Sequence, residues 1–255
     1  MRLIDTHCHL YSEEFLVDID EVLQRAESIG VQRFYLPAID SSTHDAMMEM
    51  EKKYPTKCIP MMGLHPCYVK EDFEKELLVV EEWLNKKKFV AIVEIGLDFY
   101  WDKTFASEQY EVFKLQMQWA LQRNIPIVIH TRNAMQETIE TLKPFAQQGL
   151  RGIFHCFGDT YEIAQQIIEM GFLLGIGGVV TYKKSGLAET LKNIGLQHIV
   201  LETDAPYLTP VPHRGKRNES SYLQYILQTL AEIKNATVQE VAAVTTANAE
   251  KIFSN

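Results

Sequence analysis

The chain has 255 residues, of which 46% are hydrophobic and 23% charged, enough for one large buried core and for a single α/β barrel domain over residues 1–255. The formal net charge of −9 argues against a broad nucleic-acid-binding face but leaves room for a local basic patch. No apolar run is long enough to cross a bilayer, the N-terminus lacks a signal-peptide pattern, and the four cysteines form no CxxC pair. We therefore expect a cytoplasmic protein with reduced thiols.

Short β-branched and aliphatic runs alternate with amphipathic stretches along the whole chain. Eight runs are near-continuously apolar, as parallel strands covered on both faces are. They span residues 3–9, 31–39, 58–66, 89–98, 125–132, 152–157, 172–178 and 198–206. Helical periodicity marks residues 18–30, 107–124, 132–145, 160–171 and 185–195, and a further helix over 237–253 closes the chain. The alternation predicts a (β/α)8 TIM barrel with an extra C-terminal helix, with a doubly wound open sheet as the alternative.

The first strand carries polar side chains at alternate positions. Because side chains two apart on a strand point the same way, Asp5, His7 and His9 are expected on one face. Cys8 faces the other way, and the same holds for Cys156 beside His155, so neither is predicted as a ligand. A carboxylate and two imidazoles are costly to bury unless something binds them, and a divalent metal is the obvious candidate.

Nearly every predicted strand ends in a side chain that can bind metal or transfer protons. These residues are His7, His9, His65, Glu94, Asp98, His130, Arg132, His155, Glu202 and Asp204. In a barrel the carboxyl ends of the strands meet on one rim, whereas in an open sheet they would be strung along an edge. The set is too large for a single tetrahedral site and fits two divalent cations, which can ionise a water and stabilise the oxygens of a phosphoester.

Six segments resemble the signature segments of the TatD-related metal-dependent hydrolases, which belong to the amidohydrolase-like barrel superfamily. They are HCHL, GLHP, EIGLDFY, IVIHTR, HCF and ETDAPYLTPVPHRGKRNE, and the match runs from Asp5 to the closing helix. The resemblance implies a metal-dependent-hydrolase barrel and, in many members, deoxyribonuclease activity. Glu94 stands where many relatives in the wider superfamily have a carbamylated lysine, as is typical of the TatD-like group.

The resemblance also implies how two ions (Mg, Mn, Zn, Ni or Co) are shared. One ion would be held by His7, His9 and Asp204, and Glu94 would bridge it to the second. The second ion would take His130 and His155 besides Glu94. Every expected ligand position is filled, which favours an active enzyme.

Other polar residues at the strand ends have two interpretations each. Asp204 acts as general base or as a plain ligand, and Glu202 orients the site or pairs with a core arginine. His65 hydrogen-bonds a phosphate oxygen or the leaving group, or else serves the turn before Pro66. Asp98 orients a neighbouring ligand or lines the entrance. We expect Asp204, Glu94 and His65 to be the catalytic residues.

Basic and aromatic residues near the strand ends are candidates for substrate contact. His213 and Arg214, with Lys216 and Arg217 in the same loop, are predicted to capture a phosphate-rich substrate, and a solvated charged loop is the alternative. Arg132 is a weaker candidate of the same kind. The aromatic residues 99–101 either stack on a base or belong to the core. The glycine-rich segment 175–184 is a weak phosphate-binding signal, and His44 and His198 are interpreted as structural.

The sequence therefore predicts a deoxyribonuclease that removes nucleotides from DNA ends by metal-activated water, of the 3′–5′ exonuclease type. A hydrolase of small molecules on the same dinuclear site is the nearest alternative, with lactones, cyclic amides or phosphotriesters as substrates. A non-catalytic binding module is the alternative of another class. No obligate protein partner and no membrane association is expected.

Overall fold

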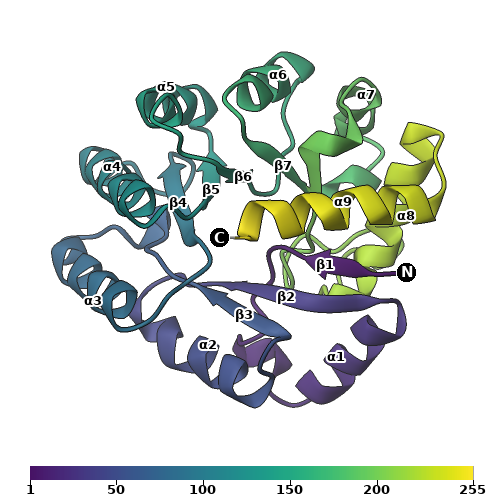
Figure 1. Cartoon of the computed structure of the whole chain (residues 1–255), viewed down its shortest axis with the longest axis horizontal. Helices are drawn as coiled ribbons and strands as arrows, with labels where there is room; N and C mark the ends of the chain where they lie inside the picture. The colour runs from purple at the N-terminus through teal and green to yellow at the C-terminus, as the bar shows by residue number, and fades with distance from the viewer. Residues whose placement is uncertain (255) are drawn as a thin grey trace.

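The computed structural model describes residues 1–254 as a ring of eight parallel strands surrounded by helices (Figure 1). The strands are β1 (Leu3–Asp5), β2 (Val31–Pro37), β3 (Cys58–Met61), β4 (Ile92–Asp98), β5 (Ile127–Arg132), β6 (Gly152–Phe154), β7 (Leu173–Ile176) and β8 (Ile199–Leu201). The helices are α1 (Ile19–Ser28), α2 (Ser41–Lys53), α3 (Phe73–Lys86), α4 (Ala106–Arg123), α5 (Met135–Ala146), α6 (Tyr161–Glu169), α7 (Leu187–Lys192), α8 (Leu223–Lys234) and α9 (Val238–Phe253). No helix within residues 1–254 is both long and apolar enough to span a membrane.

Hydrogen bonds at two seams close the strands into a barrel. Two continuous ladders have the orders β1-β2-β3 and β4-β5-β6-β7-β8. At one seam Val93 N donates to Met62 O at 3.0 Å, and at the other His9 N donates to Ala205 O at 2.7 Å. Asp204 N, which donates to His7 O at 2.9 Å, adds to the second seam. The predicted (β/α)8 barrel is therefore confirmed, and the open doubly wound sheet is excluded.

The core has two layers, one outside the ring of strands and one inside it. Inward-facing strand residues form a second apolar cluster with residues of α9: Ile4, Tyr35, Met61, Ala91, Val93, Val128, Ile153, Val200, Ala249, Ile252 and Phe253. The ring of Phe253 stacks on Tyr35 with 4.0 Å between centroids. Helix α9, which begins at a capping box between Thr237 and Glu240, lies across the ring of strands in Figure 1. The predicted closing helix thus fills one end of the barrel, and the carboxyl ends of the strands form the other.

Several strands are shorter than their apolar runs predict. The run 3–9 is a strand only over Leu3–Asp5, and the run 198–206 only over Ile199–Leu201. Asp5 does not join His7 and His9, because its carboxylate accepts hydrogen bonds from Thr203 N at 2.9 Å, Thr203 Oγ1 at 2.6 Å and Ser220 Oγ at 2.6 Å. The expected alternation fails because the chain leaves regular strand geometry after Asp5. Asp5 ties the end of β1 to the segment after β8.

Candidate metal centre

Glu94 lies at the centre of the polar cluster, on β4, with its carboxylate almost completely buried. Its Oε1 atom faces three imidazoles from β3, β5 and β6 or the residues just beyond them. His155 Nε2 and His130 Nδ1 each lie 3.1 Å from this oxygen, and His65 Nε2 lies 3.5 Å away. One carboxylate oxygen therefore faces the side of the barrel mouth formed by these three strands.

The second oxygen of Glu94 faces the opposite group of ligands. Its Oε2 atom lies 3.3 Å from His7 Nε2 and 3.9 Å from His9 Nε2. Asp204 joins this group, with Oδ1 3.5 Å from His9 Nε2 and 3.8 Å from His7 Nε2. Asp204 has a left-handed backbone conformation with φ of 56°, a costly geometry for a non-glycine residue that often occurs at functional sites. The two oxygens of one carboxylate thus point at two separate ligand sets.

Hydrogen bonds within the cluster leave some of its buried polar atoms without a partner, and divalent cations would satisfy these atoms. His7 is completely buried, yet neither of its ring nitrogens has a hydrogen-bond partner. Buried polar atoms are normally satisfied, so a buried imidazole that has no hydrogen-bond partner and faces two carboxylates fits a cation-binding site. Four groups of residues each offer three ligand atoms that lie within 4.8 Å of one another: His7, His9 and Glu94; Glu94, His130 and His155; His7, His155 and Asp204; and His65, Cys67 and His130. Imidazole and carboxylate donors suit Zn²⁺, Mn²⁺ and their neighbours.

Tyr11 sets the tautomer of His9. The Tyr11 hydroxyl donates to Pro37 O at 2.6 Å, so its oxygen accepts from His9 Nδ1 at 3.1 Å. With the proton on Nδ1, the lone pair of His9 Nε2 is directed at Glu94 and Asp204. Sequence reasoning missed Tyr11, although the residue continues the alternation of His7 and His9.

Two buried carboxylates hold the other imidazoles. His155 Nδ1 lies 3.2 Å from Glu202 Oε1, which also accepts from Cys156 N at 2.5 Å. His130 Nε2 lies 2.8 Å from Asp98 Oδ2. Each acid therefore binds the ring nitrogen that points away from Glu94, as carboxylates behind metal-binding histidines do. No arginine pairs with Glu202 among residues 1–254, and the expected alternative of a core ion pair is excluded.

His65 differs from the other histidines in the nitrogen that faces the centre. Its Nδ1 atom accepts from Cys67 N at 3.0 Å, in the short helical turn Pro66–Tyr68. The ring proton of the neutral imidazole must then be on Nε2, the atom nearest Glu94. His65 presents a hydrogen-bond donor to the site, and the turn expected as the alternative is what aims it.

Cys67 also lies near this group, within reach of His65 and His130. Burial and the neighbouring Asp98 carboxylate raise the pKa of the Cys67 thiol to about 12. Without a bound cation, Cys67 is therefore a thiol rather than a thiolate at neutral pH. Sequence reasoning did not consider this residue.

The ionisation of the cluster follows from mutual contact between acids and imidazoles. Burial by itself would raise the pKa of Glu94 and Asp204, but the fields and hydrogen bonds of the surrounding imidazoles outweigh it and lower both. Burial would lower the pKa of His130 and His155, but the carboxylates in contact with them raise both. The pKa of His7 is lowered, chiefly by burial. The charged carboxylates favour a bound cation, and the protons that the raised pKa values place on His130 and His155 must leave before these rings can bind one.

The basic residues after β8 make different contacts from one another. His213 stacks on Tyr222 with 4.3 Å between centroids, and its Nε2 lies 3.0 Å from the Tyr225 hydroxyl. Arg217 forms an ion pair with Asp18 at 2.6 Å. Arg214 is exposed and places its guanidinium 4.1 Å from the centroid of the Tyr182 ring. Arg214 and His213 are the two predicted substrate contacts in this loop. The guanidinium of Arg214 is exposed and available to a substrate, whereas the ring of His213 contacts two tyrosines.

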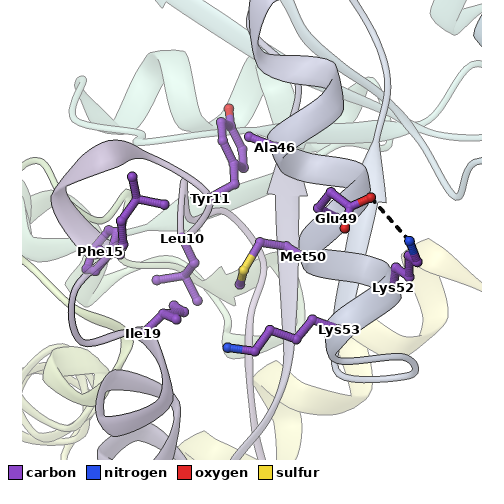
Figure 2. A pocket seen from close by; sticks show the side chains of 10 residues that line it. Leu10, Tyr11, Phe15, Ile19, Ala46, Glu49, Met50, Lys52 and Lys53 are labelled. Carbon is purple, nitrogen blue, oxygen red and sulfur yellow. Dashed lines mark hydrogen bonds and ion pairs between the residues drawn. The ribbon is translucent and has the colours of Figure 1, made fainter.

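One large cavity lies outside the metal cluster. It has a volume of about 540 Å³ and opens between α2 and the segment that joins β1 to α1. Figure 2 shows Leu10, Phe15 and Ile19 on one side of it and Met50 and Lys53 on the other. None of the predicted ligands lines this cavity, and its link to the centre is Tyr11. Its size therefore does not identify it as the site of chemistry.

The family model described as TatD related DNase matches residues 4–254. The uncharacterized metal-dependent hydrolase YabD of Bacillus subtilis (strain 168) is 39% identical over 252 residues, covering 98% of each chain. The 3′-5′ ssDNA/RNA exonuclease TatD of Citrobacter rodentium (strain ICC168) is 32% identical over 257 residues, covering 98% of this chain and 97% of that one. The crystal structure of YJJV, a TatD homologue from Escherichia coli, superposes with a TM-score of 0.92 at 25% identity, covering 99% and 98% of the two chains.

Proposed function

The chain belongs to the TatD-related DNase family of metal-dependent hydrolases, and we propose that it is a two-metal phosphodiesterase that shortens DNA strands from the 3′ end. The observation that carries the proposal is the division of the Glu94 carboxylate, with one oxygen toward each ligand set. A bridging carboxylate is the group that holds two cations a few ångströms apart. The relative named as a 3′-5′ ssDNA/RNA exonuclease supports the choice of substrate.

The residues of the centre divide into two cation sites that share Glu94. One site consists of His7, His9 and Asp204, and the other of His130 and His155. Two divalent cations bound there would lower the pKa of a water and offset the negative charge of a phosphodiester. Ligand number and chemistry accommodate Mg, Mn, Zn, Ni or Co.

The chain's own residues supply the remaining chemistry. Asp204 is the more exposed of the two central carboxylates, and it accepts the proton of the attacking water. His65 donates its Nε2 hydrogen to an oxygen of the phosphate or of the leaving group. Glu202 and Asp98 hold the rings of His155 and His130 in place.

A few basic side chains on this acidic protein bind the substrate. Arg214 and Arg132 are exposed and contact phosphates on either side of the scissile bond, and His213 adds a weaker polar contact. With a formal net charge of −9, the protein holds a few nucleotides at a strand end rather than a long duplex. The four free cysteines suit a reducing cytoplasmic setting.

The test uses metal-loaded protein and a single-stranded oligonucleotide labelled at its 5′ end. We expect a ladder of products shortened from the 3′ end, and no products with the Glu94→Gln variant. A small lactone and an aryl ester are assayed beside it. Intact DNA together with hydrolysis of the lactone or ester would identify a small-molecule hydrolase instead, and absence of bound divalent metal would favour the binding module.

A further inference from the structure

The loop that follows β4 exposes two large aromatic side chains at the rim of the barrel mouth. Tyr100 is 50% exposed and Trp101 is 68% exposed, and their rings meet edge to face with 4.8 Å between centroids. The guanidinium of Arg132 lies 3.7 Å from the centroid of the Tyr100 ring and 5.1 Å from that of Trp101. We call these three residues the rim platform. Their exposure excludes a core role for Tyr100 and Trp101, whereas Phe99 packs against the core.

The rim platform is fixed to the metal centre by one carboxylate. Asp98 Oδ1 accepts from Tyr100 N at 2.9 Å and from Trp101 N at 3.2 Å. The other oxygen of Asp98 lies 2.8 Å from His130 Nε2. In the backbone register of the β4–β5 ladder, Asp98 lies opposite Arg132. The platform therefore has a set position beside a predicted metal ligand, and little ordering is needed before it binds.

Two exposed cations at the rim platform, Arg132 and Lys103, are free of ion pairs within the described part of the chain. Arg132 forms no ion pair within residues 1–254, and exposed Lys103, whose ammonium lies 5.8 Å from the centroid of Phe99, forms none in the same range. Lys70, by contrast, is paired with Asp102 at 3.2 Å. Flat aromatic faces next to unpaired cations match a ligand that combines a planar ring with a phosphate. Neither a lipid chain nor a helix of a partner protein requires that combination.

We propose that the rim platform is a nucleobase-stacking subsite. A base adjoining the scissile phosphate stacks on the indole of Trp101, and Arg132, held against Tyr100, contacts the next phosphate. The platform sets how tightly a strand end is held and makes the enzyme prefer nucleotides that carry a base. This inference rests on the proposed nuclease function and adds a substrate-positioning site to it.

The experiment is a thermodynamic cycle that combines the Trp101→Ala variant of the protein with removal of the nucleobase from the 3′ end of the substrate. Metal-loaded wild-type and variant proteins cleave a single-stranded oligonucleotide and its counterpart with abasic residues at the 3′ end. In the wild type, base removal raises KM about tenfold, because a stacked base contributes that much to binding. In Trp101→Ala the KM for the normal strand is already about tenfold higher and base removal adds nothing, with kcat unchanged in both.

Two further variants and a binding measurement complete the test. Trp101→Phe retains an aromatic face and restores most of the affinity, and Leu78→Ala on α3, an apolar residue 61% exposed, is the matched control without effect. Anisotropy with a nuclease-resistant phosphorothioate strand measures binding without cleavage. Trp101-dependent binding of the phosphorothioate strand, together with no cleavage of the normal strand, would contradict the nuclease function and keep the subsite. Equal affinity of wild type and Trp101→Ala for the normal strand, or no binding of any strand, would overturn the subsite.

Discussion

Replacing Glu94 by glutamine tests whether one carboxylate holds two cations. The amide keeps the size of the side chain and one acceptor oxygen, but it removes the charge and places an NH₂ group against imidazole nitrogens 3.1–3.9 Å away. Two unit charges 4 Å apart interact by about 4 kcal/mol at an effective dielectric constant of 20, and half of the Glu94 charge facing each divalent cation gives the same charge product, which is about a thousandfold in affinity. Because each oxygen faces its own ligand set, both cations should be weakened by this amount.

The matched control is Glu202→Gln. Glu202 is also a buried carboxylate, but it contacts His155 on the side of the ring that points away from Glu94. Both of its hydrogen bonds, from Cys156 N and His155 Nδ1, end on Oε1 and can be kept by the amide oxygen. Only the charge behind His155 is lost, so metal affinity should fall about 10- to 100-fold.

Calorimetric titration of metal-stripped proteins and elemental analysis after dialysis measure the two variants. We expect near-complete metal loss in Glu94→Gln, partial loss in Glu202→Gln, and no nuclease activity in the former. Circular dichroism checks that both remain folded. Equal metal content in the two variants, or loss of a single ion from Glu94→Gln, would refute the bridging role.

Three further changes probe other parts of the centre. His65→Ala should lower kcat about 10²- to 10³-fold and leave metal content unchanged, since His65 donates a hydrogen bond rather than binding metal; loss of metal in elemental analysis would contradict this. Tyr11→Phe should weaken metal binding about 10- to 100-fold by calorimetry, whereas Tyr207→Phe, whose ring also packs edge-on near His9, should not; identical titrations would remove Tyr11 from the centre. In metal-free protein the raised pKa values of His130 and His155 contribute stability that is complete below the ordinary pKa of 6.5 and is lost as the pH rises through the raised values. Scanning fluorimetry in EDTA should therefore show Tm falling above pH 6.5, and added Mn²⁺ should reverse the trend because cations compete best when protons are scarce; a flat profile in EDTA would contradict the pKa assignment.

The order of strands and helices was predictable because it is written in local periodicity. An apolar run such as 125–132 has few alternatives to a covered parallel strand, and β5 occupies most of it. The chemical types near the strand ends could also be predicted, since Glu94, His130 and Asp204 lie in the second half of such runs. Boundaries were less accurate, because the end of a strand depends on where its neighbour stops pairing.

Tertiary structure decided everything that depends on partners distant in sequence. Asp5 leaves the expected face because it meets Thr203, 198 residues later, and the ring of His213 is held by two tyrosines of the following helical segment. Which nitrogen of His155 and of His130 faces the centre is likewise set by Glu202 and Asp98, 47 and 32 residues away in the sequence. The amino-acid sequence and its periodicity determine which residues can serve as ligands in the metal centre. Their directions come from hydrogen bonds across the closed barrel, which no local pattern encodes.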